Sequence, residues 1–250
     1  MKRHRRAKMQ NEISQWSVWI TGAGSGIGQA MARAFAKAGC AVALTGRQAA
    51  PLEALGEEIA AGGGRAMVLP CDVMDREGMA AAAARVVEAT GRLDMLCNNA
   101  GLNIPRRTWA DIDWPAWEAV IDINVKGALN AIAAALPTMR AQGSGVILHT
   151  SSWAGRFPAA GGGVPYGASK HALSELSATL NAEEGANGIR SCSLNPGGVA
   201  TPLMTRRPGY TPDMAATMIQ PEDLADAALF VARMNPNVAV HEITVGPVAR

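Results

Sequence analysis

The chain has 250 residues, of which 48% are hydrophobic and 18% charged, with a formal net charge of +2. This composition is ordinary for a soluble globular protein, and the length suffices for one large domain with a well-buried core. The sequence shows no apolar run long enough to cross a bilayer, which argues against an integral membrane protein.

The first ten residues, MKRHRRAKMQ, carry five Lys or Arg residues and no acid. They lack the apolar stretch of a secretory signal, so we predict a basic, disordered tail over 1–14 before a single domain over 15–250. Without those five residues, 18 basic side chains face 21 acidic ones, so the folded part is slightly acidic. A tail that binds nucleic acid or another polyanion is the alternative interpretation.

Four widely separated cysteines, Cys40, Cys71, Cys97 and Cys192, lie in or beside apolar segments and form no C-x-x-C pair. We therefore predict buried, reduced thiols in a cytoplasmic protein. The sequence has only four histidines and no cluster of metal-ligating residues, so no metal is expected.

Short apolar segments alternate with longer amphipathic ones. The predicted strands are 16–20, 40–46, 66–71, 93–98, 145–150, 189–194 and 238–245. The predicted helices lie near 27–38, 51–61, 76–90, 115–141, 166–184 and 221–233. Continuously apolar strands separated by helices indicate a doubly wound α/β fold, with a mostly parallel seven-stranded sheet and helices on both faces. The segments 101–114 and 196–220 are too long for simple connections, and we expect functional loops there, the second a substrate lid.

Thr21–Gly28, TGAGSGIG, places four glycines between the first predicted strand and the first predicted helix. The spacing G-x-G-x-x-G does not fit, whereas G-x-x-x-G-x-G fits on Gly22, Gly26 and Gly28. Such a turn presents backbone N–H groups to an anion, and the helix dipole adds to the attraction. We predict that Gly22 makes the turn, Gly26 lets the backbone approach a pyrophosphate, and Gly28 lets helix and strand pack closely. A turn that is merely tight is the alternative.

The end of the second predicted strand, LTGRQ, bears on which dinucleotide would bind. A carboxylate at this place binds the adenosine ribose hydroxyls, whereas an arginine suits a 2′-phosphate. Here Gly46 and Arg47 stand at the strand end, with Thr45 as a possible further hydroxyl donor. A guanidinium group can bind phosphate through two hydrogen bonds, so the pattern favours NADP over NAD. The alternative is a solvated arginine.

The segment VPYGASKHAL at 164–173 begins a predicted helix with Pro165 in its first turn. Tyr166 and Lys170 are four residues apart and therefore share one helical face. A free tyrosine has a pKa near 10, and a nearby ammonium group lowers this pKa by stabilising the phenolate. The pair is therefore a candidate for acid–base chemistry, although this spacing alone is common by chance.

Two further features accompany this pair. The segment SSWAG at 151–155 follows an apolar strand and supplies hydroxyl groups before the tyrosine. Asn124 falls on the apolar stripe of the predicted helix 115–141. An asparagine on a buried face requires hydrogen-bond partners, so a purely structural polar bridge is its alternative role.

Seven motifs occur in order along the chain: TGAGSGIG, CDV at 71–73, NNAG at 98–101, IDINVKG, SSWAG, YGASK and NPGGVATPL at 195–203. With them, residues 15–246 resemble the short-chain dehydrogenase/reductase family, of the Tyr-x-x-x-Lys type with a TGxxxGxG cofactor motif. The resemblance implies a Rossmann-like domain that interconverts a carbonyl compound and a secondary alcohol with NADP(H) or NAD(H). It also implies a homotetramer or homodimer that assembles through the helices 115–141 and 166–184.

The resemblance also implies roles for the catalytic residues. Tyr166 would be the general acid–base, and Lys170 would lower its pKa and bind the nicotinamide ribose. Ser152 would hydrogen-bond the substrate oxygen, and Asn124 would hold a water that links Lys170 to solvent. Ser152 precedes Tyr166 by 14 residues, one more than the commonest spacing in the family, so Ser151 stays an alternative.

The implied cofactor contacts follow the same motifs. Asp72 and Val73 would contact the adenine, and Asn98, Ala100 and Gly101 would line the cofactor cleft. In the NPGGVATPL segment, Pro196, Gly197, Val199 and Thr201 would pack beside the nicotinamide. The full set of expected cofactor residues is Gly22, Ser25, Gly26, Ile27, Gly28, Arg47, Asp72, Val73, Asn98, Ala100, Gly101, Tyr166, Lys170, Pro196, Gly197, Val199 and Thr201.

The substrate is less determined by the sequence than the cofactor is. Residues of the long loops and of the segment after the serines suit an apolar or aromatic pocket, or ordinary loop packing: Trp109, Trp153, Phe157, Met204, Tyr210, Met214 and Met218. Four arginines in the same loops are either solvated or able to attract a carboxylate or phosphate: Arg106, Arg107, Arg206 and Arg207. Two other functions stay open, an NAD-dependent alcohol dehydrogenase of the same family and a non-catalytic dinucleotide sensor.

Overall fold

Seven parallel strands form one sheet in the computed structural model, which describes residues 12–159 and 161–248. The strands are β1 (Ser17–Thr21), β2 (Ala41–Gly46), β3 (Arg65–Pro70), β4 (Met95–Asn98), β5 (Gly145–Thr150), β6 (Ile189–Pro196) and β7 (Glu242–Val245). Their order across the sheet is β3-β2-β1-β4-β5-β6-β7. The chain thus builds outward in one direction from β1 and then returns to add β4 on its other side. This reversal between β1 and β4 is where doubly wound folds bind their ligands.

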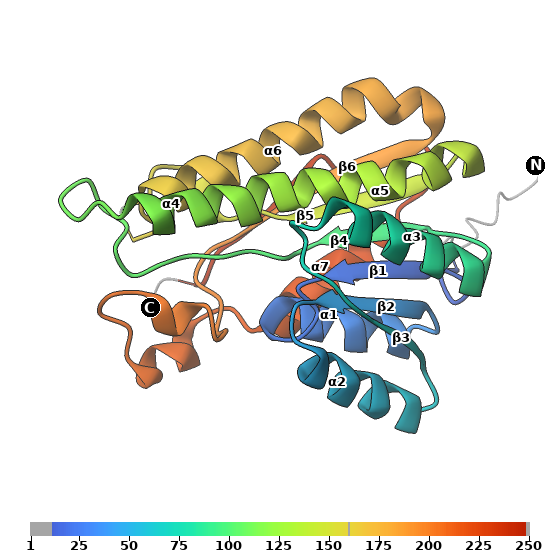
Figure 1. Ribbon diagram of the computed structural model, residues 1–250, viewed down its shortest axis with the longest axis horizontal. Helices are drawn as coiled ribbons and strands as arrows, with labels where there is room; N and C mark the ends of the chain where they lie inside the picture. Colours follow the sequence, from blue (N-terminus) through green and yellow to red (C-terminus); the bar gives the residue numbers. More distant parts are fainter. Residues whose placement is uncertain (1–11, 160, 249–250) are drawn as a thin grey trace, which may run out of the picture.

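Helices cover both faces of the sheet (Figure 1). One face carries α1 (Gly26–Lys37), α2 (Ala49–Ala61) and α7 (Pro221–Ala232). The other carries α3 (Arg76–Thr90), α4 (Trp114–Ile121), α5 (Gly127–Gln142) and α6 (Val164–Glu184). Each face has its own hydrophobic core, one containing Phe35 and Leu224 and the other Met79 and Met139. A smaller third cluster contains Trp117 of α4. The predicted doubly wound architecture is confirmed as a single Rossmann-like domain.

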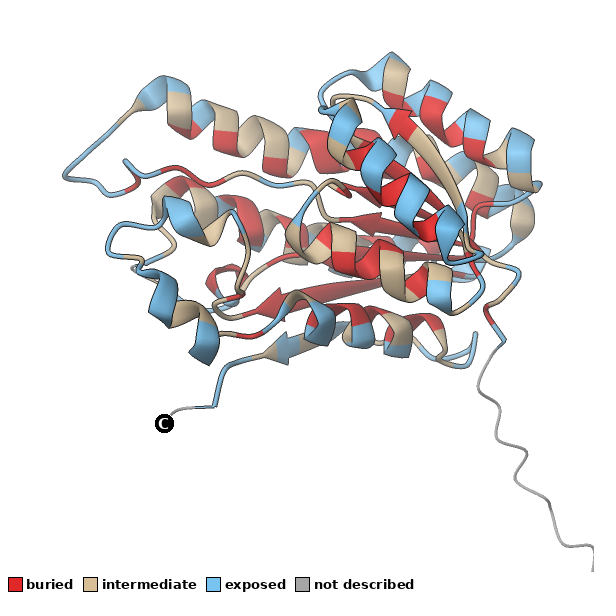
Figure 2. Cartoon of the chain, turned by 90° about the horizontal axis from the view of Figure 1, so that it is seen from below, coloured by how far each residue is buried: buried red, intermediate tan, exposed pale blue. Residues whose placement is uncertain are grey.

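Burial is deepest along the centre of the sheet, where red strands run between helices with blue outer faces (Figure 2). Every residue of β1, β4 and β5 is buried, which explains why these strands read as continuous apolar runs. The edge strand β7 is shorter than predicted, because pairing begins only at Glu242. Before it, the Arg190 side chain donates to the carbonyls of Asn235 and Val238, at 3.0 and 2.9 Å, and holds them in a turn.

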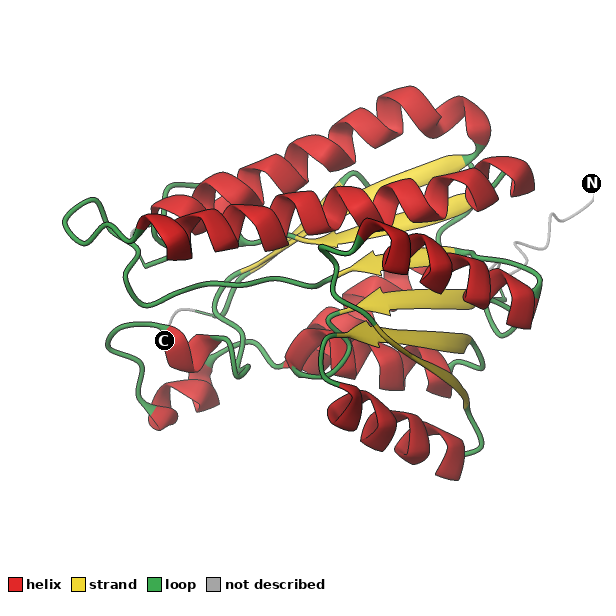
Figure 3. Cartoon of the chain, viewed as in Figure 1, coloured by secondary structure: helices red, strands yellow, loops and turns green. Residues whose placement is uncertain are grey.

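The predicted helix 115–141 forms one helical run in the structure (Figure 3). Within this run the π-helical turn η1 (Asp122–Lys126) joins α4 to α5. The run Trp114–Gln142 has 29 residues and is apolar enough to cross a membrane. This corrects the expectation that no segment has that length and character. Of its apolar window, 44% is buried inside the protein, where Ala131, Ala135 and Met139 belong to one of the hydrophobic cores.

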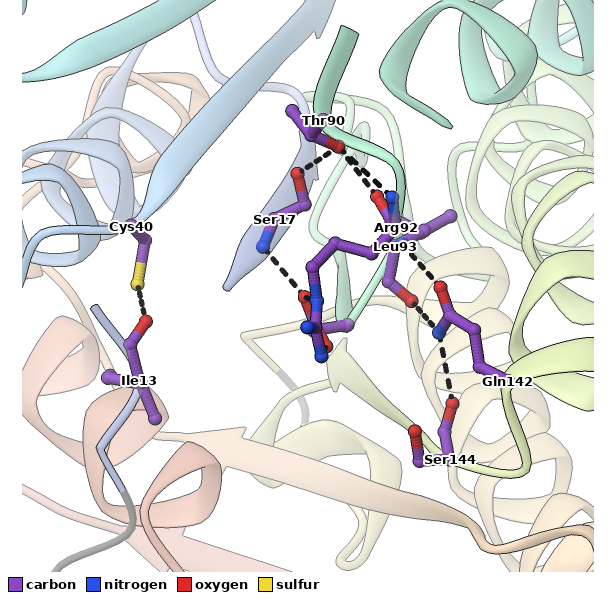
Figure 4. A network of polar contacts seen from close by, with 9 residues as sticks. Ile13, Ser17, Cys40, Thr90, Arg92, Leu93, Gln142 and Ser144 are labelled. Carbon is purple, nitrogen blue, oxygen red and sulfur yellow. Dashed lines mark hydrogen bonds and ion pairs between the residues drawn. The ribbon is translucent and has the colours of Figure 1, made fainter. Parts of the chain in front are cut away.

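Polar side chains tie together the amino-terminal edge of the sheet (Figure 4). The hydroxyl of Ser17 donates to Thr90 Oγ1 at 2.7 Å, and the Ser17 N–H donates to Asp94 Oδ2 at 2.8 Å. The Gln142 amide both accepts from and donates to the backbone of Leu93, at 2.8 and 2.9 Å. These contacts anchor the starts of β1 and β4 to the ends of α3 and α5.

The packed domain includes Ile13, ahead of the predicted start at residue 15. Ile13 is 3% exposed and belongs to the core beside α1. Its carbonyl accepts a hydrogen bond from Cys40 Sγ at 3.1 Å (Figure 4). An apolar residue therefore ends the predicted tail earlier than charge alone suggests, and residues 1–11 of that tail lie outside the described residues.

All four cysteines are unpaired; Cys40, Cys97 and Cys192 are buried, and Cys71 is half-buried. Burial raises the pKa of Cys40 to about 11 and that of Cys192 to about 12, so both stay protonated at neutral pH. Within the described ranges, no group of three or more His, Cys, Asp or Glu residues could hold a metal ion.

Candidate active site

A cleft of about 410 Å³ opens at the carboxyl ends of β1, β4, β5 and β6. Its wall is built from the glycine turn after β1 and from the segments that follow β4, β5 and β6, together with Tyr166 and Lys170 of α6. The predicted functional loops 101–114 and 196–220 extend beyond this edge, toward the left in Figure 1. The tertiary fold therefore gathers five of the seven motifs around one cavity.

The glycine turn has the geometry of an anion site. Gly22 and Gly26 adopt φ values of +66° and +53°, which favour glycine. Ser25 caps α1 without a side-chain hydrogen bond, and this described helix has no acidic residue in its first turn. The N–H groups of that turn therefore have no acceptor within the helix. The site fits the pyrophosphate of a dinucleotide, because it offers backbone donors and the positive end of a helix dipole.

Close packing around Gly28 holds this turn in place. A Cβ on Gly28 would lie 2.4 Å from the carbonyl oxygen of Gly22 and 2.6 Å from Asn99 Nδ2. A Cβ on Gly26 would lie 3.0 Å from Thr201 Cγ2, so this glycine faces the segment after β6. At Gly24 a Cβ would make only ordinary contacts.

The asparagine that supports the glycine turn is Asn99. Its Nδ2 donates to the carbonyls of Thr21 and Gly22, at 3.1 and 3.3 Å, and the residue lines the cleft. The side chain of Asn98, expected in the cleft, instead donates to the carbonyl of Ala128 on α5 at 3.1 Å. Successive side chains of a strand point to opposite faces, so only one of the pair can reach the cleft.

Tyr166 and Lys170 both line the cleft, one helical turn apart. Lys170 Nζ lies 5.4 Å from the centroid of the Tyr166 ring and donates to the Thr150 carbonyl at 2.7 Å. The Ser152 hydroxyl hydrogen-bonds Tyr166. Ser151 is buried, and its hydroxyl donates to the Lys170 carbonyl at 2.8 Å. The structure thus places Ser152 beside the phenol and uses Ser151 to anchor α6.

Burial dominates the electrostatics of this group. It raises the pKa of Tyr166 above its ordinary value, while the Ser152 hydrogen bond and the charge of Arg107 act in the opposite direction. Burial also lowers the pKa of Lys170 to about 8. The loss of solvation disfavours the phenolate. The implied role of Lys170 in lowering the tyrosine pKa stays a prediction.

Asn124 lies in the π-helical turn and is completely buried. Its Nδ2 donates to the Leu102 carbonyl at 3.0 Å and to Ser169 Oγ at 2.9 Å, while its Oδ1 accepts from the Leu102 N–H at 2.6 Å. A Cβ on Gly101 would lie 3.5 Å from both Asn124 Oδ1 and Lys170 Nζ. Asn124 therefore stands close to Lys170 and forms the polar bridge that the sequence left open, between the loop after β4 and α6.

The residues expected at the adenosine end lie outside this cleft, after β2 and β3. Arg47 is exposed, Asp72 Oδ1 accepts from the Met74 N–H at 3.0 Å, and Val73 is buried. The hydroxyl of Thr45 does not reach this surface, because the residue is completely buried and accepts from Trp19 Nε1 at 2.9 Å. Thr45 is thus corrected to a structural residue.

The segment after β6 forms the remaining wall. Pro196, Gly197, Val199 and Thr201 all line the cleft as expected. Val199 also pairs with Ile219 in an isolated parallel bridge, which ties the two ends of the predicted lid together.

Of the apolar residues suggested for a substrate pocket, Trp153 and Met204 line the cleft, and Trp109, Phe157, Tyr210, Met214 and Met218 do not. Trp109 instead packs edge-on against Trp117, with ring centroids 5.4 Å apart. Cleft residues that the sequence did not single out include Asn99, Asn103 and Gly162. Asn99 belongs to the NNAG motif, although it was not among the expected contacts. No local pattern marks Asn103 and Gly162, which reach the cleft through the packing of loops.

Comparisons with known proteins agree with this geometry. The model of the short chain dehydrogenase family matches residues 17–209. A sulfoacetaldehyde reductase of Chromohalobacter salexigens is 37% identical over 241 residues, which cover 92% of this chain and 93% of that protein. A glycine betaine reductase of Emericella nidulans is 34% identical over 234 residues, but the match covers 91% of this chain and only 18% of that protein.

Among solved structures, a metagenomic short-chain oxidoreductase in complex with NADP superposes with a TM-score of 0.81 at 31% identity. The match covers 96% of this chain and 100% of that chain. Fold, order of motifs and relatives point the same way, and the chain belongs to the short-chain dehydrogenase/reductase family of oxidoreductases.

Proposed function

We propose that this protein interconverts a carbonyl compound and a secondary alcohol with NADP(H), and that Tyr166 is its general acid–base. The observation that carries the proposal is the convergence of Tyr166, Lys170 and Ser152 on a cleft that also contains the glycine turn. The nicotinamide cofactor, when bound, supplies or accepts the hydride. Relatives named as reductases, and a similar structure with NADP, support this assignment.

The side chains have distinct tasks in this proposal. Because Ser152 hydrogen-bonds Tyr166, both hydroxyl groups can reach one substrate oxygen. In reduction, Tyr166 gives its proton to the carbonyl oxygen while Ser152 stabilises the charge that develops there. In oxidation, the phenolate accepts the alcohol proton. Lys170, held by the Thr150 carbonyl, orients the nicotinamide ribose, and Asn124 is a positioning residue for a water that leads to solvent.

The cofactor contacts are proposed along the cleft and beyond it. Gly22, Ser25, Gly26, Ile27 and Gly28 would hold the pyrophosphate. Arg47 would hold the 2′-phosphate, with Asp72 and Val73 at the adenine and the backbone of Asn98, Ala100 and Gly101 along the cofactor. Pro196, Gly197, Val199 and Thr201 would flank the nicotinamide. We also propose a cytoplasmic homotetramer or homodimer that assembles through α4, α5 and α6, where Leu129 is 44% exposed.

The function is tested with a panel of aldehydes and ketones, assayed with NADPH and NADH in parallel, and of secondary alcohols, assayed with NADP and NAD. Nicotinamide absorbance monitors each reaction. Turnover with either cofactor supports the carbonyl–alcohol chemistry. Binding of the cofactor without turnover of any panel member would instead favour the non-catalytic sensor.

The proposed NADP preference depends on Arg47, which makes no hydrogen bond or ion pair with the described residues. Replacing Arg47 by Ala is expected to weaken NADPH binding by about 10- to 100-fold, since a hydrogen bond to a charged group contributes about 1.5–3 kcal/mol. Binding of NADH, which lacks the 2′-phosphate, should not change. Titration by nicotinamide fluorescence measures both, with Arg85→Ala on the exposed face of α3 as control. Equal NADPH affinity before and after the Arg47 change would favour the NAD-dependent alternative.

The raised pKa of Tyr166 predicts different pH profiles for the two directions of the reaction. The phenol stays protonated at neutral pH, and this is the form that donates a proton to a carbonyl oxygen. The kcat of reduction should therefore change little between pH 6 and 8. The kcat of oxidation should rise about tenfold per pH unit, because the phenolate fraction does so below the pKa. Initial rates with one substrate pair test this; an oxidation rate that is flat over the range would mean that the phenolate is already formed.

A further inference from the structure

Two adjacent arginines of the loop after β4 have different environments. Arg106 is exposed and forms an ion pair with Asp111 at 2.7 Å. Arg107 is only 5% exposed and has no carboxylate partner among the described residues. Its Nη1 donates to the Gly161 carbonyl at 3.3 Å and its Nη2 to the Arg206 carbonyl at 2.7 Å. The two neighbours cannot therefore have the same role.

The Nε–H group of Arg107 is buried and has no hydrogen-bond acceptor within residues 12–159 and 161–248. A buried donor without an acceptor costs free energy, and a buried charge without a counter-charge costs more. Burial and the nearby charge of Arg207 both lower the pKa of Arg107, because both disfavour its charged form. A guanidinium group in this state is matched to an anion that the protein itself does not supply.

The cleft into which Arg107 opens is cationic. Its described lining includes Arg107, Arg207 and Lys170 but no Asp or Glu. Lys170 donates to the Thr150 carbonyl, and Arg107 has no carboxylate partner for its charge among the described residues although its Nη atoms donate to two carbonyls. Arg207 is exposed and adds a second guanidinium group to the same lining. Arg107 also lies close enough to Tyr166 for its charge to act on the phenol. The unpaired positive charge is thus near the group proposed to exchange a proton with the substrate.

Two glycines make room for these arginines. A Cβ on Gly163 would lie 2.5 Å from Cβ of Arg107, and a Cβ on Gly161 would lie 2.7 Å from Nη2 of Arg207. Gly163 also has a φ of +83°. The loop before α6 is therefore shaped around both side chains.

We propose that Arg107, with Arg207, binds an oxyanion carried by the substrate, so that the enzyme acts on aldehydes or ketones bearing a carboxylate or sulfonate group. The inference rests on the proposed carbonyl–alcohol chemistry and adds the class of substrate. An arginine matches such groups because its planar fork donates two parallel hydrogen bonds. The phosphates of the cofactor have their own donors in the glycine turn and the first turn of α1.

A purely structural role for Arg107 makes a different prediction. Its two hydrogen bonds to carbonyl oxygens connect the loop after β4 to Gly161, before α6, and to Arg206 of the lid, and we call this structural role a clamp. Loss of a clamp would slow charged and neutral substrates by the same factor. Loss of an oxyanion site would slow only the charged ones, mainly through KM. The ratio between matched substrates therefore separates the two roles.

The probes are succinate semialdehyde, its uncharged methyl ester and sulfoacetaldehyde, each reduced with NADPH. For the wild type, kcat/KM of at least one charged probe should exceed that of the ester by about 10- to 100-fold, as a charged hydrogen bond predicts. Arg107→Met should remove this advantage and leave the ester within about threefold. The matched control Arg106→Met should keep the ratio. Comparison of the carboxylate with the sulfonate shows which group the site prefers.

Binding provides a readout that does not depend on turnover. In calorimetry, succinate should bind the wild-type protein with NADP and should bind Arg107→Lys more weakly, because lysine keeps the charge but lacks the fork. Arg207→Ala, at an exposed position, should weaken the same binding without affecting the fold. Three results would overturn the inference: neither charged probe exceeding the ester in kcat/KM for the wild type, equal losses for the preferred charged probe and the ester in Arg107→Met, or loss of NADPH binding in that variant. Absence of turnover with all three probes and the panel would instead contradict the carbonyl–alcohol function.

Discussion

Replacing Tyr166 by Phe is expected to lower kcat of carbonyl reduction by about 10²- to 10⁴-fold, the usual contribution of general acid–base catalysis. The change removes the phenol hydroxyl that hydrogen-bonds Ser152 and keeps the ring in the cleft wall. The bond from Lys170 to the Thr150 carbonyl does not involve that hydroxyl. NADPH affinity should therefore stay within about twofold, and steady-state rates with fluorescence titration measure both quantities.

The chain offers a matched control, because its other tyrosine, Tyr210, lies in the lid segment outside the cleft lining. Tyr210→Phe should keep its rates within about twofold. If Tyr166→Phe turned over substrate as fast as the wild type, the acid–base assignment would be wrong. A loss of rate accompanied by a loss of NADPH binding would point to a disturbed site rather than to a missing proton donor.

Replacing Gly28 by Ala should both destabilise the fold and weaken NADPH binding by more than tenfold. The added Cβ would lie 2.4 Å from the Gly22 carbonyl oxygen and 2.6 Å from Asn99 Nδ2, so the backbone of the turn must move. Overpacking of this kind costs about 1–3 kcal/mol of unfolding free energy. The displaced N–H groups would no longer converge on a phosphate.

Gly24→Ala is the matched control, since its Cβ would lie 3.5 Å from Pro51 Cγ in ordinary contact. Its free energy of unfolding should change by no more than about 0.5 kcal/mol, as for most surface substitutions. Urea unfolding with and without NADPH compares the two variants. Equal effects of both substitutions would mean that the turn tolerates a side chain at either glycine.

The seven strands and the layers could be predicted because their signals are local and repeated. Buried central strands read as apolar runs, and each helix between them carries an apolar stripe, so both periods are visible in the letters. The edge strand β7 was predicted too long, because Val238 is apolar but its carbonyl is taken by Arg190. The π-helical turn was not predicted, since a single wide turn leaves no distinct periodicity around Asn124.

The parts of the candidate site that could be predicted from the sequence also depend on short-range relations. Tyr166 and Lys170 share a face because they are four residues apart, and the glycine spacing of Gly22, Gly26 and Gly28 marks a turn before a helix. These are short-range relations, and helix geometry suffices to predict them. In the structure, Tyr166 and Lys170 both line the cleft, and Ser152 hydrogen-bonds Tyr166. The glycine turn packs closely at Gly28.

Only the tertiary structure decided the roles of residues that are alike in the sequence. Asn99 lines the cleft and Asn98 does not, because successive side chains of an extended chain alternate. Ser151 and Ser152 both line the cleft, but the Ser151 hydroxyl already donates to the Lys170 carbonyl. Arg107 is distinguished from Arg106 by its contacts with carbonyl oxygens at Gly161 and Arg206, far along the chain. Sequence alone thus determined the fold, the family and the main chemical groups, because those follow from local patterns. Long-range packing decided burial, and burial sets which charges are solvated, which are paired and which are left for a ligand.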